Sequence, residues 1–233
     1  QNRNKNGSLY TDEWCKPIEY EDIDKGKILI ADHSFFSNRN IMEKFGFNEP
    51  LPKLISPDRL VGFLPCILIV KFKNNQVAGV MLNRRTSMLM GDMGNEMAPF
   101  MIQPIYLGGF DGDNQLSYIH SYPEISNSEK ITHDGLYFGG AFNSVRYWVQ
   151  EGTGSSFNFK FFINYFEWSI QDFNAFIKSG IWHPVEASKN SILRIRDSRG
   201  PYKAKPLWTD LMCMAGKEKP MLLDIVSKIY TDT

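Results

Sequence analysis

The sequence predicts a single mixed α+β domain, and three observations carry this prediction. The chain has 233 residues, of which 42% are hydrophobic and 22% charged, which is ordinary for a globular protein with a sizeable core. Short apolar runs alternate with amphipathic segments too irregularly for a doubly wound sheet, and no internal repeat is evident. Residues 159–182 join an apolar strand to an amphipathic helix through a tight turn.

This central unit reads FKFFINYFEWSIQDFNAFIKSGIW. Its aromatic first part, residues 159–168, is too short to span a membrane and is typical of a buried strand. Ser169 is a good helix N-cap, Asp172 follows three positions later, and Gly180 is placed to end the helix. We therefore expect Trp168 to be buried at the corner between strand and helix. The apolar face of the helix is predicted to contain Ile170, Phe173, Phe176 and Ile177.

Before this unit, the chain divides into a tail, a domain and a long connector. Residues 1–26 are polar and are predicted to be an N-terminal tail, so that the domain covers residues 27–233. Residues 27–31 form its first short strand. Residues 34–62 carry three prolines and are predicted to be an extended irregular connector, which in a compact domain is usually a binding segment or an insertion.

The elements after the connector follow from local patterns. Two apolar runs, 66–72 and 77–82, predict a hairpin across an Asn-containing turn. A Met-rich stretch at 86–101 predicts a patch that is either packed or facing a partner. The other predicted strands are 103–107, 116–121, 136–138 and 191–195. The other predicted helices begin at residue 143 or 144, at 207 and at 220.

The search for catalytic chemistry finds no recognised motif. Cys15, Cys66 and Cys213 are too far apart for a metal site or a disulfide framework, which fits a reducing compartment. No two histidines have metal-ligand spacing, and no Walker loop, dinucleotide fingerprint or nucleophile elbow occurs. No apolar run approaches 18 residues. We expect no enzyme activity, no metal, no cofactor and no transmembrane segment.

Charge is balanced overall but not locally. Lys and Arg number 26, as do Asp and Glu, so no overall field favours nucleic acid or an anionic membrane. Residues 189–219, however, carry eight Lys or Arg against three Asp or Glu. This stretch is either a solvated basic face or a nucleic-acid site. The residues that would bind nucleic acid are Arg194, Arg196, Arg199, Lys203 and Lys205.

Aromatic residues make up 14% of the chain and predict either an aromatic core or apolar surface for a partner. The connector holds several apolar side chains among Pro, Asn and charged residues. Such a segment needs outside contacts to become ordered, because it buries little apolar area by itself. Those contacts come either from a partner or from the domain itself. The candidate partner-binding residues are Phe35, Phe36, Phe45, Phe47, Leu51 and Leu54.

Several motifs in a fixed order carry a resemblance to a known family. They are ILIA (28–31), VAGVMLNRR (77–85), PIYLGG (104–109), LYFGG (136–140) and the unit at 159–182. In this order the chain resembles the AlgH/YqgE-like family over roughly residues 27–212. LYFGG, FKFF and the closing LWTDLM are most similar to its plastid branch in plants and algae. The resemblance implies a branched mixed β-sheet that forms a pseudo-barrel with flanking helices.

The departures from the family pattern concern small residues and prolines. Arg85 and Phe110 stand where the family has proline, and Asn164, Phe166 and Glu167 replace its small residues. Large side chains at such positions fill space that a ligand or another backbone would use. The residues that keep the pattern, and so mark a surface for a ligand or partner, are Asn83, Arg84, Gly108, Gly109, Tyr165 and Trp168.

The resemblance implies little about function. A retained core with altered surface positions and a longer connector indicates a protein recruited to a new role. We expect a non-catalytic accessory subunit or assembly factor of a larger organellar complex, in a plastid or mitochondrion, with protein partners. The alternative is a transcriptional regulator that binds nucleic acid or a small ligand, which rests on the regulator label of bacterial relatives and on the basic stretch.

Overall fold

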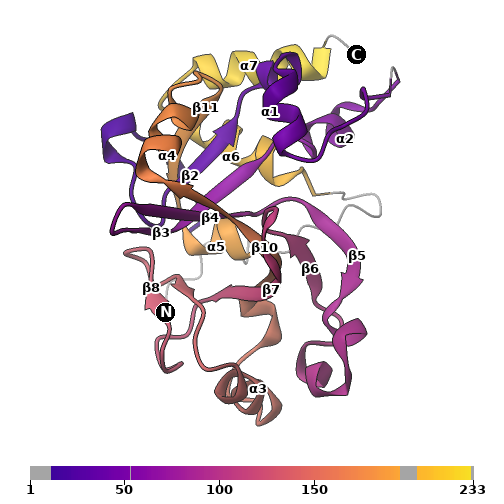
Figure 1. Ribbon diagram of the computed structural model, residues 1–233, viewed down its shortest axis with the longest axis vertical. Coiled ribbons are helices and arrows are strands. Elements are labelled where there is room, and N and C mark those ends of the chain that lie inside the picture. Colours follow the sequence, from indigo (N-terminus) through magenta and orange to yellow (C-terminus); the bar gives the residue numbers. More distant parts are fainter. Residues whose placement is uncertain (1–11, 53, 195–203, 232–233) are drawn as a thin grey trace, which may run out of the picture.

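The structure, a computed structural model, describes residues 12–52, 54–194 and 204–231. One branched sheet organises this part of the chain (Figure 1). Its strands are β1 (Cys15–Pro17), β2 (Ile28–Ala31), β3 (Cys66–Lys73), β4 (Gln76–Met81), β5 (Arg85–Leu89), β6 (Pro104–Leu107), β7 (Asp111–His120), β8 (Glu129–Lys130), β9 (Tyr137–Phe138), β10 (Phe159–Ser169) and β11 (Trp182–Ala187). They are paired in the order β1-β11-β2-β3-β4-β10-β7-β9-β8, and β5 is attached through β6 to β10.

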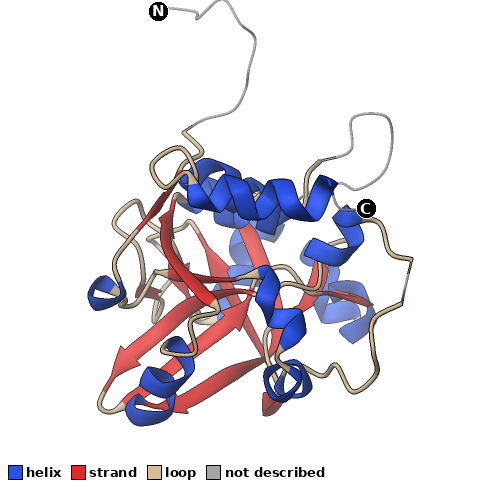
Figure 2. Ribbon diagram, turned by 90° about the horizontal axis from the view of Figure 1, so that it is seen from above, coloured by secondary structure: helices blue, strands red, loops and turns tan. Residues whose placement is uncertain are grey.

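The helices are short and lie around the sheet (Figure 2). The α-helices are α1 (Arg39–Lys44), α2 (Pro57–Val61), α3 (Phe142–Gln150), α4 (Ile170–Ile177), α5 (Lys189–Leu193), α6 (Leu207–Ala215) and α7 (Met221–Thr231). The 3-10 turns are η1 (Tyr20–Asp22), η2 (His33–Ser37), η3 (Met90–Met93), η4 (Asn95–Phe100) and η5 (Ser156–Asn158). Trp208 connects α6 to β2, because its buried indole N–H donates to the Ala31 carbonyl at 2.8 Å.

Strand β10 is the branch point of the sheet. Its first part pairs antiparallel with β7 and parallel with β6, and its last four residues pair antiparallel with β4. The change of partner occurs at a bulge at Asn164, where φ is +61°. Asn tolerates this left-handed conformation better than most residues, so it can replace the glycine of the family pattern.

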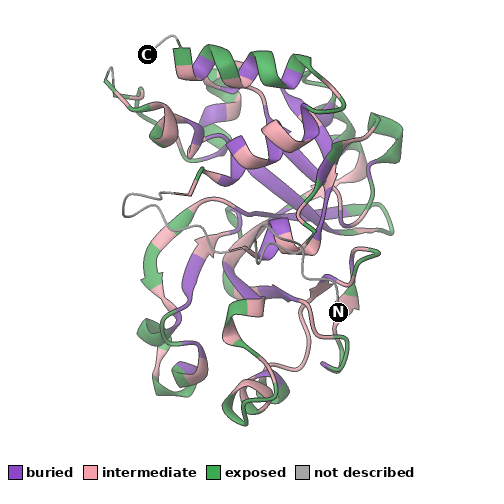
Figure 3. Ribbon diagram, turned by 180° about the vertical axis from the view of Figure 1, so that it is seen from behind, coloured by how far each residue is buried: buried purple, intermediate pink, exposed green. Residues whose placement is uncertain are grey.

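Both faces of the first four residues of β10 are buried, and three of these residues are phenylalanine. Phe162 and Phe166 belong to the larger hydrophobic core, with β2, β3, β4 and the closing helices. Phe159 and Phe161 belong to a smaller core with Met90 and Phe100. Side chains alternate between the faces of a strand, so one strand joins both cores. Figure 3 shows the buried strands inside and the exposed outer face of α7.

The sheet is mixed and branched, as the resemblance implied, but it is not a barrel. Most pairs are antiparallel, and β10 with β6 is parallel. Within the described residues the path begins at β1 and ends at β8, and these two strands do not pair with each other. The expected pseudo-barrel is therefore corrected to an open, strongly branched sheet.

The predicted N-terminal tail is wrong over the part that the structure describes. Residues 1–11 lie outside the described residues, but β1 pairs antiparallel with β11, with Cys15 opposite Ala187. Cys15 and Ile23 are buried in the larger core. The strand is only three residues long, so no local pattern distinguishes it; its pairing with β11 is a contact between residues far apart in the chain.

Two other segments differ from their predictions. A strand was predicted at 191–195, but residues 191–193 form the last part of α5. The Ser188 hydroxyl accepts from the Ser191 amide and so caps this helix. Ile195 lies outside the described residues. Residues 86–87 lie in a separate short strand, β5, which was not predicted and which pairs with β6. The Met-rich stretch is divided: Met90 and Met97 are buried, while Met88 and Met101 are exposed.

Trp168 is only half-buried, which corrects our expectation of full burial. It lies at the predicted strand-to-helix corner, and Ser169 caps α4 by accepting from the Asp172 amide at 3.1 Å. Trp182 in β11, by contrast, is fully buried and packs on Phe176 with ring centroids 4.6 Å apart. Trp168 lies one residue before the end of β10, next to the exposed Glu167, and part of its side chain stays accessible.

Candidate functional site

Gly108 and Gly109 hold the backbone of β6 and β10 in close contact. The Gly108 amide donates to the Ile163 carbonyl, and its carbonyl accepts from the Met81 amide, both at 2.8 Å. A Cβ on Gly109 would lie 2.1 Å from the carbonyl atoms of Tyr165. These glycines are therefore needed for close packing of backbone segments.

Asn83 and Arg84 fix the corner that follows β4. The Asn83 side chain accepts from the Cys66 amide at 3.0 Å and donates to the Leu64 carbonyl at 2.8 Å. The Arg84 guanidinium donates to the Phe45 carbonyl and lies 4.4 Å from the centre of the Phe47 ring. Burial lowers the pKa of Arg84. Arg84 thus ties the connector to the sheet.

The connector packs against the sheet. Phe35 and Phe45 are fully buried, whereas Phe36, Phe47 and Leu51 are partly buried against the larger core. Only Leu54 among the six predicted partner-binding residues is exposed, at 97%. Phe35 and Phe45 make their ring contacts within the domain, so neither is exposed to insert into a partner.

Trp168, another residue that keeps the family pattern, lies in the wall of a hollow lined by aromatic rings. We call this surface the aromatic hollow and define it by Phe45, Phe110, Phe166, Trp168 and Phe176. Its volume is about 530 Å³. Polar residues at its edge include Lys44, Asp111, Asp172 and Ser179. Its lining residues come from α1 and the residue after it, the segment after β6, the end of β10 and α4.

The rings of the aromatic hollow pack on one another in a continuous series. Phe166 stacks on Trp168 with centroids 5.4 Å apart, and Trp168 stacks on Phe176 at 5.2 Å. Phe45 lies 5.0 Å from Phe166, and Phe110 contacts Phe166 edge-on at 5.9 Å. Phe110 is 46% exposed and forms the open wall. Mutual packing holds these side chains in place before anything binds.

The sequence analysis named Trp168 and Phe45, in separate sets of candidates, but not Phe110, Phe166 or Phe176 as parts of one surface. The signal that could have found it is the pair of departures at Phe110 and Phe166, both aromatic and in contact. Tyr165, the other aromatic of the family pattern, lies on β10 and contacts the larger core. It does not line the aromatic hollow.

The carboxylates at the edge of the aromatic hollow have structural partners. Asp111 accepts from the Glu167 amide at 3.0 Å, and Asp172 accepts from the Ser169 hydroxyl at 2.7 Å. Among the described residues no group of three or more His, Cys, Asp or Glu side chains could hold a metal ion. Both carboxylates thus make structural hydrogen bonds at the edge of the aromatic hollow.

The predicted basic stretch is only partly described. Arg196, Arg199 and Lys203 lie outside the described residues. Arg194 pairs with Glu13 at 2.9 Å, and Lys205 lies 3.8 Å from Asp58. Neither cation therefore supports nucleic-acid binding by itself.

Asp32 and His183 form a hydrogen-bonded acid–base pair in which His183 Nε2 lies 2.9 Å from Asp32 Oδ2. Burial alone would raise the pKa of Asp32, but hydrogen bonds from His183 Nε2 at 2.9 Å and from Ser34 outweigh it and hold that pKa well below its usual range. Asp32 also accepts from the Ser34 amide at 2.8 Å and so caps η2. The pair stabilises the start of the connector.

His120 is fully buried, and its burial predicts how the free energy of unfolding depends on pH. Burial lowers its pKa, although the Gly139 carbonyl, 2.9 Å from Nε2, favours the charged ring. The Tyr122 amide donates to Nδ1 and requires that nitrogen to be unprotonated. The unfolded chain takes up a proton near pH 6.5, before the folded chain does. The free energy of unfolding should therefore fall as pH drops below about 6.5, by up to about 1.4 kcal/mol per pH unit.

This prediction is measured by urea unfolding between pH 8 and pH 5.5. His120→Gln should reduce the loss of stability over this interval, whereas His133→Gln, at an exposed histidine, should leave it unchanged. An identical pH dependence in wild type and His120→Gln would contradict it.

The comparison with known families decides the identity of the fold. The family model described as AlgH-like (DUF179) matches residues 65–219, which is more than half of the chain. The chain belongs to the AlgH-like family. The chain is similar to a UPF0301 protein of Parabacteroides distasonis, with 32% identity over 139 residues that cover 59% of this chain and 69% of that protein. A UPF0301 protein of Bacteroides fragilis is 25% identical over 137 residues, with the same coverage.

Two solved structures have the AlgH-like fold seen here. A Corynebacterium diphtheriae protein matches with a TM-score of 0.57 and 18% identity, covering 90% of this chain and 94% of that one. The AlgH protein of Pseudomonas aeruginosa matches with a TM-score of 0.54 and 13% identity, covering 85% and 92%. At such identities the likeness concerns the fold alone. These relatives are bacterial, so the expected placement in the plastid branch, and in an organelle, has no support from them.

The aromatic hollow lies only partly within the residues that match the AlgH-like family model. Phe110, Phe166, Trp168 and Phe176 lie within residues 65–219, whereas Phe45 belongs to the connector outside that match. Among the helices that the structure describes, none combines the length and the apolar character that a membrane span requires.

Proposed function

We propose that this AlgH-like protein is a non-catalytic accessory subunit or assembly factor, and that the aromatic hollow receives an apolar side chain of a partner protein. The observation that carries the proposal is the series of packed rings with Phe110 exposed at its wall. Aromatic residues in well-packed surface sites dominate the energy of many protein interfaces.

The size and rigidity of the aromatic hollow support this role. Its volume of about 530 Å³ can accommodate a large side chain with part of its backbone. The lining rings come from α1, β10, α4 and the segment after β6, and they are held by one another. A partner therefore loses little free energy to ordering this surface.

The charges at the edge support a protein partner over an isolated apolar ligand. Lys44 and Asp172 carry opposite charges on the rim of an apolar centre. An apolar centre with a polar rim of mixed sign is typical of protein interfaces. The organellar setting expected from the sequence is not part of this proposal, because the reported relatives are bacterial. The regulator alternative lacks an observation that favours it.

The proposal predicts a change in native mass for one variant. Full-length protein should co-migrate with a larger assembly in native separation of an extract of its source. Phe110→Asp places a charge in the wall of the aromatic hollow and should move the protein to its free mass. Because Phe110 is 46% exposed, the melting temperature should change by only a few degrees.

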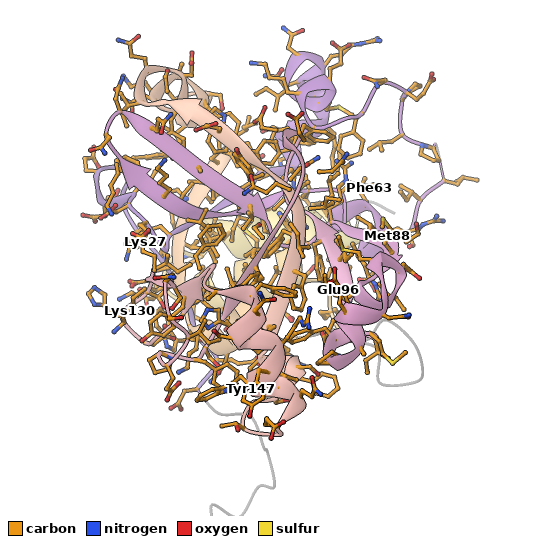
Figure 4. All side chains as sticks on the ribbon, turned by 60° about the horizontal axis from the view of Figure 1, so that its bottom comes forward. Lys27, Phe63, Met88, Glu96, Lys130 and Tyr147 are labelled. Carbon is orange, nitrogen blue, oxygen red and sulfur yellow. The ribbon has the colours of Figure 1, made fainter. Side chains whose placement is uncertain are left out.

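The matched control is Tyr147→Asp. Tyr147 is 66% exposed on α3, at the opposite end of the molecule from α1 and α4, and its side chain points outward (Figures 1 and 4). This variant should stay in the assembly. Free migration of the wild type, or continued co-migration of Phe110→Asp, would contradict the proposal.

A further inference from the structure

A second hollow adjoins the aromatic hollow and shares Trp168 and Asp111 with it. We call it the polar trough; its volume is about 450 Å³. The hairpin of β3 and β4 and the end of β10 supply its remaining lining residues, which are Asn74, Asn75, Gln76, Glu167 and Ser169. The two shared residues offer an indole ring and a carboxylate, so the surface between the two hollows is not purely apolar.

We propose that the partner segment that enters the aromatic hollow carries an arginine or lysine beside its apolar side chain, and that this cation lies at Trp168 and Asp111, where the aromatic hollow meets the polar trough. The inference rests on the proposed function and adds the chemistry of the partner. An indole ring attracts a cation through its electron-rich face, and a carboxylate attracts it by charge. Arginine suits both contacts, because its planar guanidinium stacks on a ring and donates to carboxylate oxygens.

The charges of the lining favour a cation in the partner. Three carboxylates line the two hollows against one cation, and all four side chains are exposed: Asp111, Glu167, Asp172 and Lys44. In the part of the chain that the structure describes, none of the ion pairs involves one of these carboxylates. Lys71 donates to Gln76 from outside the lining, and carboxylates still outnumber cations when it is counted. A partner cation therefore gains attraction without displacing an existing ion pair.

Trp168 is available for this contact. Its ring stacks on Phe166 and Phe176, and its side chain is half-buried, so part of it stays accessible. The chain itself contains such a contact elsewhere, because the Arg84 guanidinium lies 4.4 Å from the centre of the Phe47 ring. Among the described residues, no lysine or arginine lies over the Trp168 ring in this way. A partner can therefore supply that cation.

The polar trough is held in shape before a partner binds. Asn74 and Asn75 form the hairpin turn with φ of +50° and +62°, and the Asn75 carbonyl accepts from the Ile170 amide at 3.1 Å. The Asp111 carboxylate accepts from the Glu167 amide at 3.0 Å, which orients it at the edge of the trough. Binding therefore orders few groups on this side of the interface, and little conformational entropy is lost there.

Three departures from the family pattern meet at this surface. Phe110 and Phe166 line the aromatic hollow and Glu167 lines the polar trough, at positions where the family has proline or small residues. Together they add two rings and one negative charge. The combination of added rings and added negative charge fits a partner segment that is both apolar and basic.

The experiment selects short random peptides, displayed on phage, on the immobilised full chain. Peptides that bind the wild type but not Phe110→Ser are kept, because this variant removes a ring of the aromatic hollow without adding a charge. The kept peptides should carry arginine or lysine within a few residues of a large apolar side chain. Their affinity should fall as salt rises from about 0.05 M to about 0.5 M, because screening weakens an exposed charge pair.

Asp111→Asn tests the position of the cation. This variant keeps an oxygen that can accept from the Glu167 amide but removes the charge, so it should weaken the binding of the kept peptides about fivefold. Glu167→Gln, which changes an exposed side chain, should weaken binding in the same direction and decides if Asp111→Asn fails to fold.

The control is Glu151→Gln. Glu151 is exposed directly after α3, at the opposite end of the molecule from α1 and α4 (Figure 1). It should leave the affinity of the kept peptides unchanged. Kept peptides without an excess of arginine and lysine over aspartate and glutamate, or equal affinity for the wild type and Asp111→Asn, would overturn this inference and leave the proposed function standing. Failure to obtain any peptide that depends on Phe110 would overturn both.

Discussion

Gly109→Ala is expected to prevent the chain from folding to this structure. The added Cβ would lie 2.1 Å from the Tyr165 carbonyl carbon and oxygen and 2.5 Å from the Phe166 amide nitrogen. These are backbone atoms at the branch of the sheet, so a side-chain rotation cannot relieve the overlap. The loss should exceed about 5 kcal/mol, which is comparable to the whole stability of a domain.

The measurement is soluble yield followed by urea unfolding, with Gly62→Ala as the control. Gly62 has a helical φ of −63°, and the nearest atom to its Cβ would be 3.3 Å away. Gly62→Ala should change stability by no more than about 1 kcal/mol. A folded Gly109→Ala protein of near wild-type stability would show that β6 and β10 are not packed as described.

Phe45→Ala is expected to destabilise the protein by about 3–5 kcal/mol. Phe45 is 2% exposed and packs against Phe35, Phe166, Phe176 and Trp182. Removing its ring leaves a cavity where the connector meets the sheet. For the same reason, deletion of residues 38–60 should lower the melting temperature sharply.

Leu54→Ala is the matched control within the connector. Leu54 is 97% exposed, so its truncation should change the free energy of unfolding by less than about 0.5 kcal/mol. If the deletion or Phe45→Ala left the melting temperature unchanged, the connector would be an independent arm, as one of the two sequence interpretations held.

The elements with a strong local pattern were predicted well. The hairpin of β3 and β4 turns through Asn74 and Asn75, both at positive φ, which is the conformation that two-residue hairpin turns require. The cap of α4 at Ser169 and the closing helices were confirmed. In each case the deciding interactions join residues close in the sequence.

The elements that were missed depend on distant contacts. β11 contains Pro184, which weakens any strand pattern, and it forms because β1 and β2 pair on either side of it. In the sequence, nothing distinguishes Phe45 from the other aromatic residues of the connector. Its contact with Trp182 is formed only in the folded chain. The aromatic hollow likewise combines side chains from separate segments of the chain, so Trp168 could be named from the sequence but the assembled hollow could not be predicted.

The central claim is that the aromatic hollow contacts a partner protein, and site-specific photo-crosslinking tests it most directly. A photoreactive benzoylphenylalanine would replace Phe110 in one sample and Tyr147 in another, each in full-length protein within its native extract. We predict one discrete protein adduct from position 110 and none of that mass from position 147. Absence of an adduct at position 110, or the same adducts from both positions, would contradict the proposed function.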